Sequence, residues 1–156
     1  MTRSPVPVLV LVAAGFLLAP GRVVAQKGKP TGPPIRVTPT PATIAFPTPG
    51  IAEFDIGHVD QSGVTVAVRP RPNKGPWELR IRADAPDMGG YGKPVGDILW
   101  RQEGSSTWKP LSTTDEVVIQ GQSNEDVVLY FRLLLDWTRD EPNTYSANIV
   151  FTAIHL

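Results

Sequence analysis

The chain has 156 residues, no cysteine, and 15 basic against 15 acidic residues, so its formal net charge is zero. This balance argues against a nucleic-acid-binding protein, which normally gathers a basic excess in a patch. The lack of cysteine excludes disulfides, thiol nucleophiles and cysteine-based metal sites, so a folded domain must rest on a buried core of its own.

The N-terminal segment has the pattern of a signal peptide. Arg3 lies close to the amino terminus, and residues 8–19 form an unbroken apolar run. The run is shorter than the roughly 18 apolar residues of a membrane-spanning helix, but it matches the apolar region of a secretion signal. We therefore expect residues 1–25 to be removed by cleavage between Ala25 and Gln26, which leaves no membrane span in the mature chain. An uncleaved N-terminal anchor is the alternative.

Prolines dominate the segment that follows, residues 26–41, which we expect to be an extended tether. Proline fixes φ and removes a backbone donor, so this density prevents helix and interrupts sheet ladders. The folded domain is therefore predicted to span residues 42–156. Without the two arginines of the predicted leader, the mature chain has two more acidic than basic residues.

From Ala42 onward, apolar residues recur with a period of two, which is typical of strands with one buried face. We expect short strands at 43–46, 52–56, 63–69, 77–84, 97–101, 107–108 and 116–120, a long central strand at 127–137 and a last strand at 145–153. No helix is expected after residue 25. About eight short strands with turns at roughly ten-residue spacing predict a single all-β domain, an antiparallel β-sandwich of two sheets and of the immunoglobulin-like kind.

Residues that usually carry catalysis or bind metals are few. The only histidines, His58 and His155, are expected at the surface without a catalytic partner, and no Gly-x-Ser-x-Gly motif occurs. Acidic pairs such as Asp140-Glu141 lie at predicted turns, where carboxylates are usually solvated, and none forms a calcium-binding loop. We therefore expect a non-enzymatic protein that needs no cofactor and no metal.

Aromatic residues are the main candidates for ligand binding. Trp77 and Trp137 fall in phase with the predicted core faces, so packing explains them. Trp108 follows a predicted hairpin turn, and Tyr91 lies in the glycine-rich loop between Pro86 and Pro94. Tyr91, Trp108 and Lys93, which lies in the same loop as Tyr91, are the predicted contacts with a ligand or partner.

Two segments resemble the signature of WxL-type bacterial cell-surface domains, in which a Trp-x-Leu motif is followed by a distal Tyr-x-x-x-Ile-Thr-Trp-Thr-Leu motif. The matching positions in this chain are Trp77, Leu79, Tyr145, Ile149, Phe151 and Thr152, of which Phe151 stands where the family has Trp. Two further positions depart from the pattern, Val150 in place of Thr and Ala153 in place of Leu. The resemblance implies a β-sandwich that attaches non-covalently to the bacterial cell wall.

Three classes of function stay open from the sequence. The first is an exported structural or wall-binding module, in the periplasm, at the cell surface or outside the cell, whose partner is cell wall, another glycan or another envelope protein. The second is a subunit of an extracellular fibre assembled by strand exchange, in which a segment with Ile35, Val37, Ile44 and Phe46 would pair with a neighbouring copy. The third is a secreted inhibitor that acts through the loop 86–94, or a small glycan-binding protein.

Overall fold

The computed structural model describes residues 35–42, 44–70, 75–89 and 92–156, and most of these lie in strands. The predicted signal peptide, the first part of the predicted tether and Tyr91 lie outside the described residues. The elements are β1 (Arg36–Thr40), α1 (Ile51–Ile56), β2 (His58–Arg69), β3 (Trp77–Ala83), β4 (Asp87–Met88), β5 (Lys93–Pro94), the 3-10 helix η1 (Val95–Asp97), β6 (Ile98–Gln102), β7 (Lys109–Pro110), β8 (Glu116–Gly121), β9 (Glu125–Leu134) and β10 (Ile149–His155). The prediction of an all-β chain is confirmed.

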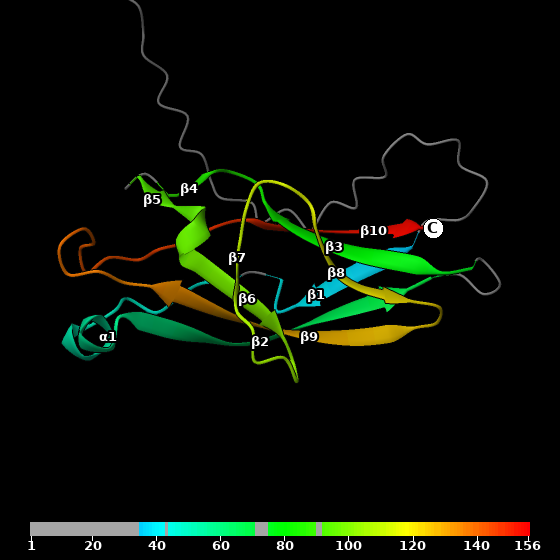
Figure 1. The fold of residues 1–156 in the computed structure, drawn as a ribbon, viewed down its shortest axis with the longest axis horizontal. Coiled ribbons are helices and arrows are strands. Elements are labelled where there is room, and N and C mark those ends of the chain that lie inside the picture. Colours follow the sequence, from blue (N-terminus) through cyan, green and yellow to red (C-terminus); the bar gives the residue numbers. More distant parts are fainter. Residues whose placement is uncertain (1–34, 43, 71–74, 90–91) are drawn as a thin grey trace, which may run out of the picture.

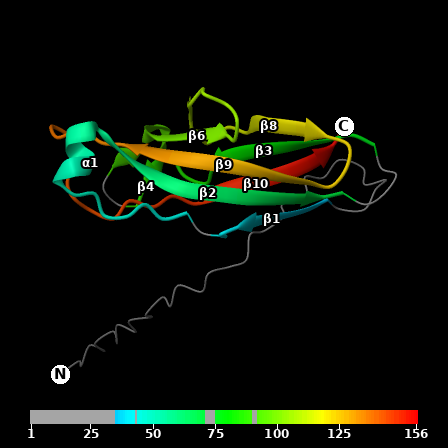
Figure 2. The same ribbon diagram turned by 90° about the horizontal axis from the view of Figure 1, so that it is seen from below.

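Two larger sheets lie one above the other (Figure 1). One has five strands in the order β1-β2-β9-β6-β7, and the other has three in the order β10-β3-β8. Strands β4 and β5 form a separate pair at one end. Every strand pair in the described ranges is antiparallel, as predicted. Strand β9 lies between β2 and β6, so the predicted central strand is central (Figure 2).

A single apolar cluster contains side chains from both sheets. Val64 and Val66 of β2 and Leu129 and Phe131 of β9 are fully buried, as is Leu79 of β3 in the other sheet. Because successive side chains of a strand point to opposite faces, the residues between these turn outward. The outward row of β9 is where the candidate site lies.

The folded part begins earlier than the predicted boundary at residue 42. Strand β1 pairs with β2 along its whole length, and the flanking Ile35 and the strand residue Val37 are buried. Proline at position 39 is compatible with this strand because β1 is an edge strand, where a missing ladder donor can face away from the sheet. The prediction that residues 26–41 form a tether is therefore wrong for residues 36–40.

The segment 52–56, predicted as a strand, is the helix α1, so the expectation of no helix after residue 25 is also wrong. The carboxylate of Glu53 accepts a hydrogen bond from the backbone N–H of Gly50 at 2.9 Å, which satisfies an unpaired donor at the helix start. Gly57 ends the helix with φ at 78°, a left-handed conformation that glycine adopts without strain. Phe54 is the one buried residue of the helix, whereas Ile56 is 63% exposed.

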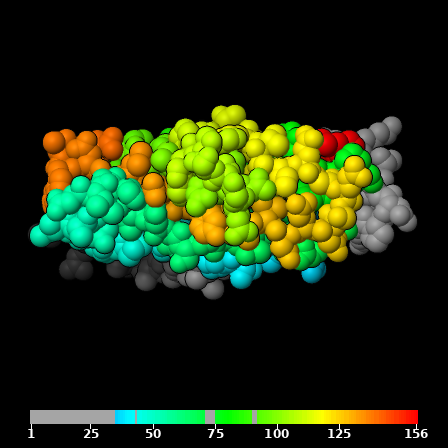
Figure 3. Space-filling view, turned by 60° about the horizontal axis from the view of Figure 1, so that its bottom comes forward, coloured from blue at the N-terminus to red at the C-terminus, as the bar shows by residue number. Residues whose placement is uncertain are grey.

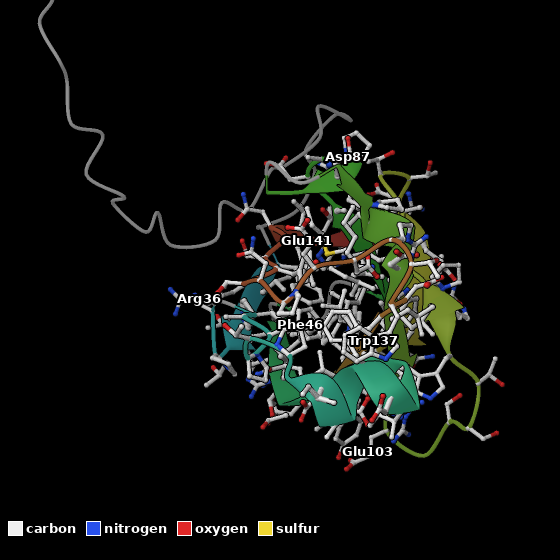
Figure 4. The ribbon with its side chains drawn as sticks, turned by 90° about the vertical axis from the view of Figure 1, so that its left-hand side faces the viewer. Arg36, Phe46, Asp87, Glu103, Trp137 and Glu141 are labelled. Carbon is white, nitrogen blue, oxygen red and sulfur yellow. The ribbon has the colours of Figure 1, made fainter. Side chains whose placement is uncertain are left out.

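Trp137 does not face the core as predicted, because β9 ends at Leu134. Its side chain is 51% exposed and lies beside α1 at one end of the molecule (Figure 4). The ring centroid is 4.5 Å from that of Phe54, and the indole N–H donates to the carboxylate of Asp55 at 3.2 Å. Trp137 thus fastens α1 to the end of β9.

Two polar residues expected at the surface are buried wholly or in part. Glu78, on the predicted wet face of β3, is 5% exposed, and its carboxylate accepts hydrogen bonds from Gln120 and Arg80. The hydrogen bond from Gln120, and secondly that from Arg80, lowers the pKa of Glu78. His155 lies in β10 opposite Trp77, and both of its ring nitrogens are buried without a hydrogen-bond partner in the part of the chain that the structure describes.

The length and apolar content that a membrane crossing requires are not found in any helix of the described ranges.

Candidate functional site: a hollow on the five-stranded sheet

A hollow of about 460 Å³ lies on the outer face of the five-stranded sheet. This volume is in the range of small-molecule sites, about 300–1,000 Å³. Strands β2, β6 and β9 supply its floor, and the loop between β6 and β7 supplies a wall. The loop stands over the middle of this face (Figure 3). The lining residues are Asp60, Gln61, Arg101, Gly104, Ser105, Ser106, Trp108, Tyr130, Phe131 and Arg132.

Guanidinium groups and aromatic rings alternate across the hollow. The Cζ atom of Arg101 is 4.7 Å from the ring centroid of Tyr130 and 5.0 Å from that of Trp108. The Cζ atom of Arg132 is 4.6 Å from the ring centroid of Trp108. The strand register explains this order, because Arg101 of β6 stands opposite Tyr130 of β9 on the outward face. These distances lie within the range of cation–π attraction.

The two arginines have different partners. Arg132 donates from Nε and Nη2 to the two carboxylate oxygens of Asp60, at 2.6 and 2.8 Å, across the β2–β9 register. This hydrogen bonding from Arg132 lowers the pKa of Asp60 and raises that of Arg132. The paired charges hold Arg132 in place under the ring of Trp108.

Arg101, in contrast, has no carboxylate partner within 4 Å among the described residues. Its Nη1 atom donates to the backbone carbonyl of Ser105 at 2.8 Å, and its other contacts are the two rings. A guanidinium carries five N–H donors in a planar fork that fits a carboxylate bidentately. The one aspartate of the lining is hydrogen-bonded to Arg132, so Arg101 is the arginine of the hollow that has no hydrogen-bonded carboxylate among the described residues.

A second carboxylate borders the hollow without neutralising Arg101. The hydroxyl of Tyr130 donates to Glu103 at 3.2 Å, at the tip of the loop between β6 and β7. Glu103 is exposed. This hydrogen bond connects the tip of the loop to strand β9.

Trp108 is the one predicted contact residue that the structure places in the hollow, where it is half-buried between Arg101 and Arg132. Tyr91 lies outside the described residues. Lys93 was predicted to contact a ligand or partner, but the residue is only 4% exposed, so its side chain is not available at the surface for such a contact.

Carboxylates surround the ammonium group of Lys93. Its Nζ atom donates to Asp140 Oδ2 at 2.6 Å and to Asp97 Oδ2 at 2.9 Å. Arg139 in turn donates to Asp97 at 2.6 Å. Asp140 belongs to an acidic pair that was predicted to be solvated, but it is 9% exposed. Helix η1 and the turn at 136–140 bring these carboxylates around Lys93, a convergence that no local sequence pattern indicates.

The positions of the WxL resemblance lie away from the hollow. Trp77 and Leu79 are fully buried in β3, and Tyr145 is 3% exposed. Ile149, Phe151 and Thr152 are half-buried in β10, beside β3. Five of these six residues belong to strands β3 and β10 of the three-stranded sheet and Tyr145 precedes β10, whereas the hollow opens on the outer face of the five-stranded sheet.

Of the lining residues, only Trp108 was predicted as a contact, and the residues missed include the four that form the ion pair and the other ring contacts of the hollow, Asp60, Arg101, Tyr130 and Arg132. The outward row of the central strand, with Tyr130 and Arg132, was visible as a face that alternates with the core positions. The strand register that places Asp60 and Arg101 beside this row could not be seen in the sequence, because it depends on which strands become neighbours.

Within the described ranges, no three acidic or histidine side chains are placed so that they could hold a metal ion. A comparison of the chain with models of known protein families, with curated proteins and with solved structures gives no match.

Proposed function

We propose that this protein is a non-enzymatic, exported module of the cell envelope or cell surface that binds an anionic glycan, such as a cell-wall strand, in the hollow of its five-stranded sheet. The observation that carries the proposal is Arg101, a guanidinium placed between two aromatic rings and left without a carboxylate partner among the described residues. Its free donors would take a carboxylate of the ligand.

The chemistry of the lining favours a sugar polymer with acidic groups over a purely apolar ligand. Tyr130 and Trp108 offer ring edges and partly exposed ring surface to the C–H groups of a sugar, and Ser105, Ser106 and Gln61 offer hydrogen-bonding groups for hydroxyls. A hollow with aromatic walls and a few converging polar groups is typical of ligand sites. The lining includes no histidine, and its one carboxylate is bound to Arg132, which supports binding over catalysis.

The architecture supports the same proposal. Two antiparallel sheets that share one core are consistent with an immunoglobulin-like β-sandwich. The signal-peptide pattern of residues 1–25 supports export, and the resemblance to WxL domains supports attachment to the cell wall.

The strand-exchange and inhibitor hypotheses have less support. Ile35, Val37, Ile44 and Phe46, the residues expected to be donated to another copy, pack in the core of the chain's own fold. The loop 86–94 is anchored at both ends, because Met88 and Lys93 are buried.

Retention on insoluble cell-wall material tests the proposal. The purified chain is incubated with peptidoglycan and with whole envelope, and the bound fraction is measured beside that of Arg101→Gln. A hydrogen bond to a charged group contributes about 1.5–3 kcal/mol, so losing it should weaken binding about tenfold or more. Arg69→Gln is the matched control, because Arg69 is a half-buried arginine of the same sheet that pairs with Asp126 outside the hollow.

We expect the wild-type protein and Arg69→Gln to be retained alike, and Arg101→Gln and Trp108→Ala to be retained weakly while circular dichroism reports an intact fold. No retention on any envelope fraction contradicts the proposal. An equal loss in Arg101→Gln and Arg69→Gln also contradicts it, since binding would then depend on overall charge and not on the hollow.

A further inference from the structure

The buried charge cluster around Lys93 has the composition of a reactive site. The side chain of Lys93 is 2% exposed, that of Asp140 is 3% exposed, and that of Asp97 is 15% exposed. The Nζ atom lies 2.6 Å from Asp140 Oδ2 and 2.9 Å from Asp97 Oδ2, and 5.6 Å from the ring centroid of Tyr145. An amine is thus in direct contact with two carboxyl groups in a place that water scarcely reaches.

Burial makes the ionic form of such a pair costly. Removing an ammonium and a carboxylate from water carries a large desolvation penalty, which their mutual attraction offsets only in part. An amide formed from the same two groups is neutral, so it carries no such penalty for charge. The surroundings of Lys93 and Asp140 therefore favour condensation in a way that an aqueous pair does not.

We propose that Lys93 and Asp140 form an intramolecular isopeptide bond. The Nζ atom of Lys93 attacks Cγ of Asp140, a new N–C bond forms, and one C–O bond of the carboxyl group breaks. An ammonium and a carboxylate are consumed, and an amide and one water molecule are produced. Two protons of the ammonium leave with the departing oxygen, so the step balances without an oxidant or a co-reactant.

The neighbours of the pair have the positions that this step requires. Asp97, which Arg139 holds by a 2.6 Å hydrogen bond, is placed to accept a proton from the amine and to return it to the departing oxygen. The backbone N–H of Asp136 donates to Asp140 Oδ2 at 2.9 Å, where it stabilises negative charge that develops on the carboxyl oxygen. Holding amine and carboxyl group in contact replaces a bimolecular encounter, which is a large part of the barrier to condensation.

Lys109 and Glu116 provide an internal comparison. Their Nζ–Oε1 distance is 2.7 Å, nearly that of Lys93 and Asp140, but the two side chains are 45% and 38% exposed. Water stabilises these charges, and no second carboxylate contacts Lys109 among the described residues. This pair stays ionic.

The bond would join two segments that are 47 residues apart in the chain, β5 and the turn that follows β9. A covalent link over such a distance restricts the unfolded chain, as a disulfide does. In a chain without cysteine, it would provide the cross-link that exported domains commonly obtain from disulfides.

Peptide mapping of the full chain tests the proposal. The protein, expressed from residue 1, is denatured and digested with trypsin, which releases the peptides 83–101 and 140–156 if no bond joins them. We expect a branched peptide whose mass is that of the two together less one water molecule. Fragmentation should place the link at Lys93 and Asp140. The variant Lys93→Met abolishes the branched peptide, and Asp97→Asn slows its formation by on the order of 100-fold.

Each outcome decides the proposal. Free peptides 83–101 and 140–156 in the wild-type digest, with no branched product, overturn it. Loss of one water within 83–101 alone also overturns it, because the bond would then join Lys93 to Asp97. Lys109 and Glu116 lie in one tryptic peptide, 102–132, because trypsin does not cut before Pro110. Loss of one water molecule within that peptide, through a link between these two residues, contradicts the role given to burial. The wild-type digest is decisive even if a variant fails to fold.

Discussion

Trp77 and Trp137 occupy positions that the alternation of the sequence does not distinguish, but the fold gives them very different surroundings. Trp77 is fully buried, and its indole N–H donates to the carbonyl of Ser123 at 2.9 Å. Replacing a core tryptophan by alanine costs about 3–5 kcal/mol. Trp137 is 51% exposed and contributes a ring contact with Phe54, worth about 0.5–1.5 kcal/mol, and an exposed hydrogen bond. We therefore expect Trp77→Ala to lower the free energy of unfolding by about 3–5 kcal/mol and Trp137→Ala by no more than about 2 kcal/mol.

Urea denaturation followed by far-ultraviolet circular dichroism measures both changes, since removal of a tryptophan does not affect this signal as it affects fluorescence. The comparison requires equal slopes of free energy against urea concentration in the two variants. Equal losses in Trp77→Ala and Trp137→Ala, or a larger loss in Trp137→Ala, would refute the assignment of Trp77 to the core and of Trp137 to the end of the domain.

Three further predictions concern close packing, pH and the domain boundary. Gly121→Ala should lower the melting temperature clearly, because a Cβ atom at Gly121 would overlap the ring of Trp77. Gly96→Ala should lower it little, because a Cβ atom there meets only an ordinary van der Waals contact. Similar melting temperatures of the two variants would contradict this packing. Because Arg132 lowers the pKa of Asp60 in the folded state, the wild type should exceed Asp60→Asn in stability above the ordinary aspartate pKa near 4, by at most about 1 kcal/mol for this exposed pair. That difference in stability should vanish as the pH falls through the lowered pKa of Asp60. A difference that grows in acid would contradict a lowered pKa of Asp60 in the folded state. Deleting the chain through the end of β1 should lower the melting temperature, because β1 pairs with β2 along its whole length. An unchanged melting temperature would indicate that this segment is a tether and not part of the folded domain.

The class of the fold could be predicted from the sequence because period-two alternation follows directly from strand geometry. Strand β3 and the central strand β9 carry the clearest alternation, and both were located to within a few residues at their starts. One error arose where few residues were available to establish a period. In the segment 52–56, two apolar residues two positions apart fit a strand, but the glycines at 50 and 57 and the carboxylate of Glu53 complete one short helix.

The candidate site could be predicted only in part, because its residues are brought together by strand order. Trp108 was chosen from its place after a hairpin turn, and it does lie in the hollow. Arg101 and Asp60 come from strands on either side of β9, and nothing local in the sequence fixes that order. The burial of Lys93 was missed for the same reason, since Asp140 lies 47 positions further along the chain.

The most direct test of the proposed function is the NMR spectrum of the tryptophan indole N–H groups during titration with soluble, acidic cell-wall fragments. We expect the indole signal of Trp108 to shift progressively as ligand is added, together with the backbone signals of Arg101 and Tyr130, whereas the indole signal of the buried Trp77 should not shift. The same shifts should be weak in Arg101→Gln. Shifts that gather elsewhere on the molecule, or a spectrum that the fragments leave unchanged, would contradict the hollow as the ligand site.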